Sequence, residues 1–161
     1  MILRKRAWDM VRDRFFTVEE TGTLLDAINA FEDLMAVQPD GHTILVTDES
    51  GGLKGTVSIW DLLRFINDFL LDRDLLKEAE SGGFDDIFKR ACQICASTPL
   101  VKLVDTKVQV IKPTEPLILI LEDFLKGGRS LAVVQEAGKI LGVIHVNDLY
   151  LEISRGVASH H

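Results

Sequence analysis

Residues 53–62 of the chain read LKGTVSIWDL, and residues 140–149 read ILGVIHVNDL. Each stretch has a glycine followed by an apolar run, and an aspartate and a leucine close it. The two glycines, Gly55 and Gly142, are 87 residues apart (142 − 55), and the two aspartates keep the same offset. A fixed offset between similar stretches indicates an internal repeat, and a repeat determines the architecture.

The similarity continues toward the N-terminus of each stretch. The turn glycines Gly51 and Gly138 keep the offset of 87, and so do the apolar runs before them. Further upstream, residues 15–18 match residues 108–111 at an offset of 93 (111 − 18). The six extra residues lie in the first copy, in a linker at 35–42 that contains the turn signal QPDG.

Each copy has the pattern of a strand, a helix, two strands and a second helix. In the first copy Thr23 is a predicted N-cap with Asp26 three residues later, and apolar residues then recur at helical spacing. Residues 44–47 and 56–59 are β-rich runs around a hairpin turn, and a second helix is predicted over 61–71.

The second copy is less clear, because residues 117–121 (LILIL) also suit a buried strand. Pro116 before them and Gly127–Gly128 after them favour a helix, as does the parallel with the first copy. The sequence predicts an α/β (α+β) fold with repeats at 7–71 and 99–155. The charged segment between them, 72–98, is predicted to form one or two extra helices.

Composition limits the classes of function. The formal net charge is −7, which argues against nucleic acid as the main partner. No apolar run approaches the ~18 residues that a membrane-spanning helix requires, and the N-terminus lacks the order of a signal peptide, so we expect a cytoplasmic protein without a membrane partner. Cys92 and Cys95 lack a second ligand pair for zinc and suit two thiols on one helix.

These residues resemble the CBS (cystathionine β-synthase) domain, present here as a tandem pair, or Bateman module. The family signature is Gly, two mostly apolar residues, Ser or Thr, two variable residues and Asp. Residues 55–61 (GTVSIWD) match it fully, whereas residues 142–148 (GVIHVND) carry His145 in place of the hydroxyl residue. The resemblance implies a pseudo-two-fold pair of repeats with two clefts, which in the family hold AMP, ADP, ATP or S-adenosylmethionine, and it implies a homodimer.

The resemblance also implies roles for individual residues. Asp61 and Asp148 would accept hydrogen bonds from ribose hydroxyls, while Ser58 and His145 would contact ribose or phosphate. Thr17 and Val18 of the first strand would hold the adenine. An ionised carboxylate is acceptor-only and suits a vicinal diol. The alternative is that both aspartates only cap their helices, since the spacing from Ser58 to Asp61 is that of a capping box.

Four basic residues could bind phosphate. His42 and Arg129 precede equivalent strands, 87 residues apart (129 − 42), and Arg12 and Lys107 lie ahead of the first strand of each copy. Arginine has a fixed charge and a fork of donors that suits phosphate, whereas histidine titrates near neutrality. The alternative for His42 and Arg129 is that both are solvated loop residues.

Two functions remain open from the sequence. One is a regulatory sensor that binds an adenine nucleotide or S-adenosylmethionine, needs no other cofactor and acts on an unknown partner protein. The other is a ligand-free structural or dimerisation module of the same fold, acting through its insertion. No phosphate-binding loop, nucleophile elbow or metal-ligand cluster appears, so we expect no enzymatic activity and no metal site.

Overall fold

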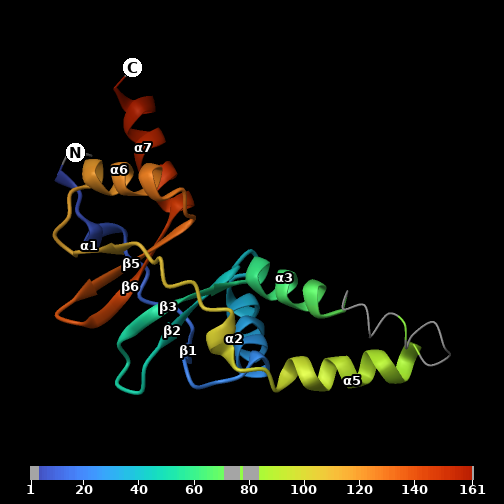
Figure 1. Ribbon diagram of the computed structural model, residues 1–161. Helices are drawn as coiled ribbons and strands as arrows, with labels where there is room; N and C mark the ends of the chain where they lie inside the picture. Colours follow the sequence, from blue (N-terminus) through green and yellow to red (C-terminus); the bar gives the residue numbers. More distant parts are fainter. Residues whose placement is uncertain (1–3, 71–76, 78–83, 161) are drawn as a thin grey trace. The chain divides into compact units, whose positions relative to one another are not determined.

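Each copy of the repeat forms its own three-stranded sheet in the computed structural model, which describes residues 4–70, 77 and 84–160 (Figure 1). In each sheet the strands lie in chain order, and the first two strands run parallel. The strands are β1 (Thr17–Glu19), β2 (Thr43–Thr47), β3 (Leu53–Ser58), β4 (Val110–Ile111), β5 (Leu131–Glu136) and β6 (Lys139–His145). Together with the helices, they confirm the predicted mixed α/β fold.

The helices follow the predicted order, and their ends have the expected caps. Thr23 and Asp26 form the capping box of the first repeat's first helix, and Gly128 ends the corresponding helix of the second repeat with a left-handed φ of 61°. Residues 117–121 are therefore helical, as the parallel between the copies predicted. The repeat helices are α2 (Leu24–Val37), α3 (Ile59–Leu70), α6 (Leu117–Gly127) and α7 (Val146–Ser159). Helix α3 begins two residues earlier than predicted.

Outside this pattern, the described part of the chain also contains α1 (Ala7–Met10), α5 (Phe84–Ala96) and the 3₁₀ turn η2 (Leu100–Lys102). Cys92 and Cys95 both lie on α5, as predicted, and both are free thiols. Burial raises the pKa of the Cys95 thiol, and the neighbouring Cys92 raises it further. The other predicted part of the insertion, 72–83, falls outside the described residues except at position 77.

The chain divides into two compact units, each made of stretches that are not continuous in the sequence. Unit 1 contains the residues up to Phe15, Ser50–Leu53 and the residues from Lys107 onward. Unit 2 contains Phe16–Glu49 and Lys54–Thr106. The segment before each repeat therefore packs with the other repeat. We call residues 4–12 leader 1, which belongs to unit 1, and residues 97–105 leader 2, which belongs to unit 2.

The two leaders make the same backbone hydrogen bonds in their respective units. Each leader accepts a bond from the first residue of a repeat's first helix and donates one to the chain just before that helix. In unit 1 these bonds are Leu117 N to Lys5 O at 3.0 Å and Ala7 N to Glu115 O at 2.9 Å. In unit 2 they are Leu24 N to Thr98 O at 2.9 Å and Leu100 N to Gly22 O at 2.9 Å. The leaders thus satisfy helix N-terminal groups that would otherwise lack partners.

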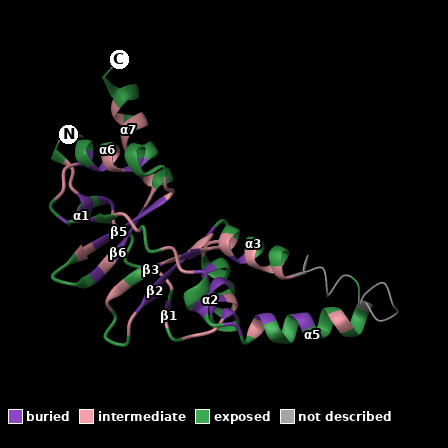
Figure 2. Ribbon diagram, viewed as in Figure 1, coloured by how far each residue is buried: buried purple, intermediate pink, exposed green. Residues whose placement is uncertain are grey.

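Apolar side chains of the leaders complete the two hydrophobic cores. Ala7 and Met10 are buried with Ile120 and Ile144 in unit 1. Leu100 and Leu103, which are 93 residues later, are buried in unit 2. The central strands β2 and β5 are almost wholly buried, whereas the exposed residues lie mainly on helices and turns (Figure 2). Burial of these apolar surfaces is the main force that holds each leader in place.

Candidate functional site

The motif glycines are the points where the leaders come closest to the sheets. In unit 1 the backbone of Arg12 exchanges two hydrogen bonds with Val143, at 2.8 and 2.9 Å. A Cβ on Gly142 would lie 2.2 Å from the carbonyl oxygen of Arg12. In unit 2 a Cβ on Gly55 would lie 2.5 Å from the carbonyl oxygen of Asp105. Only glycine allows this approach, which explains why the signature begins with it.

In unit 1 the candidate residues lie at one edge of the sheet. Because β4 and β5 run parallel, the residues that precede them, Lys107 and Arg129, lie at the same edge. The antiparallel strand β6 ends at this edge with His145, which pairs with Leu131 and is the N-cap residue of α7. The structure therefore gathers three predicted site residues around the start of α7.

Asp148, in the first turn of α7, is held by Arg12 from leader 1. Arg12 Nε donates to Asp148 Oδ2 at 2.6 Å, and Arg12 Nη2 donates to Asp148 Oδ1 at 2.8 Å. Both carboxylate oxygens are thus engaged by one guanidinium in a bidentate ion pair, a strong and directional arrangement. The side chains are 24% exposed for Asp148 and 42% for Arg12.

In unit 2 the corresponding residues meet at the corresponding edge. The amide of Ile59, the first residue of α3, donates to the carbonyl oxygen of His42 at 2.9 Å. The His42 ring lies next to Thr43, with Nδ1 2.9 Å from the hydroxyl oxygen. Ser58 ends β3 and immediately precedes α3. Thr17 begins β1 and pairs with Leu45, the third residue of β2, so it lies further along the sheet than His42.

Asp61 has partners that differ from those of Asp148. Its Oδ2 accepts from the amide of Ser58 at 2.9 Å and from the Ser58 hydroxyl at 3.0 Å. The amide of Asp61 donates in turn to the Ser58 hydroxyl at 3.2 Å. These bonds form the capping box that the sequence offered as an alternative. The Oδ1 atom of Asp61 lies 3.7 Å from Arg64 Nη1, beyond hydrogen-bond distance.

Other candidates are placed less directly. Val18 is only 8% exposed and belongs to the core of unit 2, so its side chain packs inward. Thr17 is exposed on β1, an edge strand of its sheet. Trp60, the residue before Asp61, is 61% exposed.

Two neighbours of the candidate residues were not singled out from the sequence. Arg64 lies on the same face of α3 as Asp61, a relation that the spacing of three residues could have indicated. Asp105 occupies in leader 2 the position that Arg12 occupies in leader 1, at the offset of 93 (105 − 12). The structure brings this residue to the first repeat because leader 2 packs in unit 2.

Among residues 4–70, 77 and 84–160, no group of three or more His, Cys, Asp or Glu side chains is arranged to hold a metal ion. Within the same ranges, no helix combines the length and the apolar character needed to cross a bilayer.

The sequence model of the CBS domain matches residues 7–68 and 100–155, which cover both motifs and most of both leaders. The chain belongs to the CBS domain family. No curated protein matches it at a significant level of sequence similarity.

Solved structures of CBS proteins share this fold at low sequence identity. A CBS domain-containing protein of unknown function from Kribbella flavida superposes with a TM-score of 0.68 at 19% identity, covering 98% of this chain and 100% of that one. CBSX2 in complex with AMP gives 0.64 at 17% identity, with coverages of 94% and 98%. The cytosolic domain of the Mg²⁺ channel MgtE in complex with ATP gives 0.67 at 17%, covering 93% of this chain and 49% of that one.

Proposed function

We propose that this CBS pair is a regulatory module that binds an adenosyl ligand, AMP, ADP, ATP or S-adenosylmethionine, and transmits its binding to a partner protein. The observation that carries the proposal is the repeated placement of a partly exposed carboxylate, Asp61 or Asp148, in the first turn of a helix at a sheet edge. The structures of two fold relatives, CBSX2 and MgtE, contain AMP and ATP.

The chemistry of each edge supports a ribose with an attached charged group. A carboxylate accepts two hydrogen bonds from the vicinal diol of ribose. The helix N-terminus beside it is the positive end of the helix dipole, which favours an anion. In unit 1, Arg129 and Lys107 lie at the same edge and add positive charge. In unit 2, His42 is the basic residue at that place.

A ligand panel tests this function. Thermal unfolding of the full chain is measured with ATP, ADP, AMP, adenosine and S-adenosylmethionine. A ligand at about 100 times its Kd stabilises the folded state by about 2.7 kcal/mol, which for a chain of this size raises Tm by roughly 5–10 °C. The double variant Asp61→Asn/Asp148→Asn is the control and should lose this shift. No shift with any of the five compounds contradicts the proposal.

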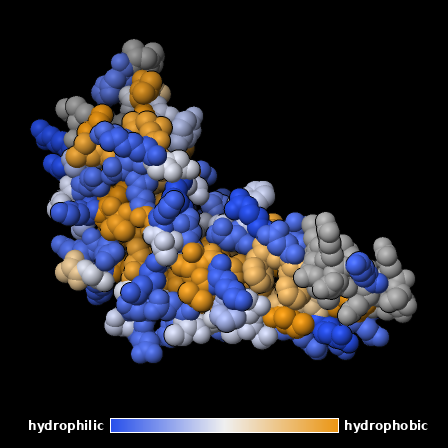
Figure 3. Space-filling model, viewed as in Figure 1, coloured by the Kyte–Doolittle hydropathy of each residue, from blue (hydrophilic) through white to orange (hydrophobic). Residues whose placement is uncertain are grey.

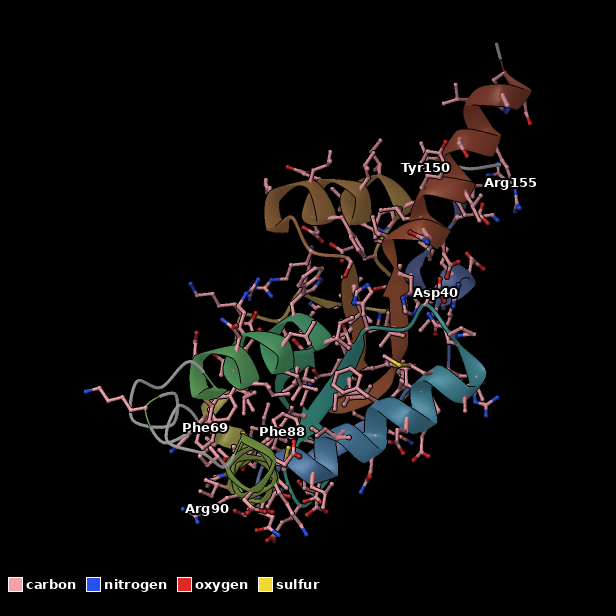
Figure 4. All side chains as sticks on the ribbon, turned by 90° about the vertical axis from the view of Figure 1, so that its right-hand side faces the viewer. Asp40, Phe69, Phe88, Arg90, Tyr150 and Arg155 are labelled. Carbon is pink, nitrogen blue, oxygen red and sulfur yellow. The ribbon has the colours of Figure 1, made fainter. Side chains whose placement is uncertain are left out.

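A second candidate, a module that acts through protein contacts, is favoured by exposed apolar side chains on the helices of unit 1. On α6, Ile118 is 62% and Leu125 is 75% exposed, and on α7, Tyr150 is 68% exposed. Figure 3 shows hydrophobic residues at the surface over α6, and Figure 4 shows Tyr150 on α7. We propose that these faces pair in a homodimer. Light scattering should give twice the monomer mass, and the variant Leu125→Glu should give the monomer mass.

A further inference from the structure

The Arg12–Asp148 ion pair uses the same atoms that a ribose would use. The guanidinium fork spans both carboxylate oxygens, at 2.6 and 2.8 Å. A vicinal diol also binds a carboxylate through two neighbouring donors, one to each oxygen. A carboxylate has about four lone-pair sites, but both forks approach it through the same two oxygens, so we expect a ribose diol that binds Asp148 in this way to displace the guanidinium of Arg12.

The backbone of Arg12 does not need to move for this to happen. Its amide and carbonyl groups are both bonded to Val143, and Gly142 lies directly against its carbonyl oxygen. The side chain is 42% exposed, which leaves room for other rotamers. Leader 1 therefore fixes where the guanidinium starts, and only side-chain torsions decide whether it holds Asp148 or another anion.

In unit 2 the residue equivalent to Arg12 is Asp105, which has the opposite charge. The backbone of Asp105 exchanges two hydrogen bonds with Thr56, both at 2.9 Å, as Arg12 does with Val143. Gly55 lies against the carbonyl oxygen of Asp105, as Gly142 does against that of Arg12. By this equivalence the backbone of Asp105 takes in unit 2 the place that the backbone of Arg12 takes in unit 1, so an acidic residue stands there instead of a basic one.

We infer that Arg12 makes the Asp148 site dependent on phosphate: the guanidinium leaves the carboxylate only when a nucleotide phosphate takes the carboxylate's place. This inference rests on the proposed function. Adenosine would break the ion pair and offer Arg12 no new anion. A nucleotide supplies a phosphate that suits the same fork, close to the positive charges of Arg129 and Lys107.

Calorimetric titration of ATP and adenosine into the wild type and Arg12→Ala tests the inference. Arg12→Ala should bind ATP about tenfold more weakly, because the fork for phosphate is gone, and adenosine about threefold more tightly, because Asp148 is freed. In an Asp148→Asn background, Arg12→Ala should no longer raise the affinity for adenosine. The variant Lys139→Ala, which removes an exposed cation at the far end of β6, should change the ratio of the two affinities by less than about twofold.

A spectroscopic measurement reports on the Arg12 side chain itself. The Nε–H resonance of Arg12 is assigned by its disappearance in Arg12→Lys, and it should shift with ATP but not with adenosine at equal concentration. If Arg12→Ala leaves the ratio of ATP to adenosine affinity unchanged, or weakens both ligands equally, the inference is wrong while the proposed function stands. If neither protein binds any adenosyl compound, both are wrong.

Discussion

The two motif aspartates share a position in the repeat but not a set of partners. Asp148 in unit 1 is paired through both carboxylate oxygens with Arg12. Asp61 in unit 2 closes a capping box with Ser58, and Arg64 lies 3.7 Å from its other oxygen. The backbone frame around the two is the same, since each leader forms the same bridge to the strand before the helix.

The partners of the two aspartates differ because the two copies have different residues at two equivalent positions. His145 replaces the serine of the first copy, and no side-chain cap bond forms at that N-cap. Arg12 and Asp105 occupy equivalent places on the exchanged leaders but have opposite charges. Duplication therefore preserved the geometry of two sites, whereas divergence at a few side chains separated their chemistry.

The largest expected effect is a loss of stability when a motif glycine, which packs against a leader in both units, is replaced. Gly142→Ala would place a Cβ 2.2 Å from the backbone of Arg12, and Gly55→Ala would place one 2.5 Å from that of Asp105. Overpacking against backbone costs about 1–3 kcal/mol, so each variant should lose that much stability in urea unfolding.

The matched control for the glycines is Gly127→Ala. Its Cβ would meet the end of the Gln109 side chain, which can shift, and alanine favours the helix in which Gly127 lies. This variant should stay within about 1 kcal/mol of the wild type. Tolerance of both motif substitutions would mean that the leaders do not pack as closely as the structure shows.

A smaller effect should distinguish the two aspartates. Asp61→Ala removes a capping box and should cost about 1 kcal/mol at any salt concentration. Asp148→Ala removes a partly exposed ion pair and should cost about 0.5–1 kcal/mol at low salt and less at 1 M NaCl. Urea unfolding at both salt concentrations measures this. An equal salt dependence for the two variants would show that their partners do not differ in solution.

The smallest effect concerns a carboxyl group that only unit 1 has. Burial and a hydrogen bond with Asp123 raise the pKa of Glu115 from 4.5 to about 7, although the charge of Lys112 acts the other way. Gly22 stands at the equivalent position in unit 2 (115 − 93). The folded state holds this proton more tightly than the unfolded state, so the stabilisation is complete below pH 4.5 and is lost as the pH rises through about 7.

Glu115→Gln should therefore have a weaker pH dependence of Tm between pH 5.5 and 8.5 than the wild type. Its matched control is Glu136→Gln, an exposed glutamate of the same unit, which should keep the wild-type slope. If the slope of Glu115→Gln equals that of the wild type, Glu115 is ionised in the folded protein at neutral pH.

The sequence by itself determined the repeat, the order of its elements and the motif. Offsets of 87 and 93 identified equivalent residues, and local signals such as the Thr23–Asp26 capping box and Gly128 predicted helix ends correctly, because these depend on neighbours within a few residues. The offset of 87 also located the two candidate carboxylates, Asp61 and Asp148. Only the tertiary structure decided their partners. Arg12 and Asp148 are 136 residues apart, and Asp105 reaches Thr56 of the first repeat through the exchange of leaders. Such pairings depend on how apolar surfaces of distant segments are buried together, and no local pattern encodes them.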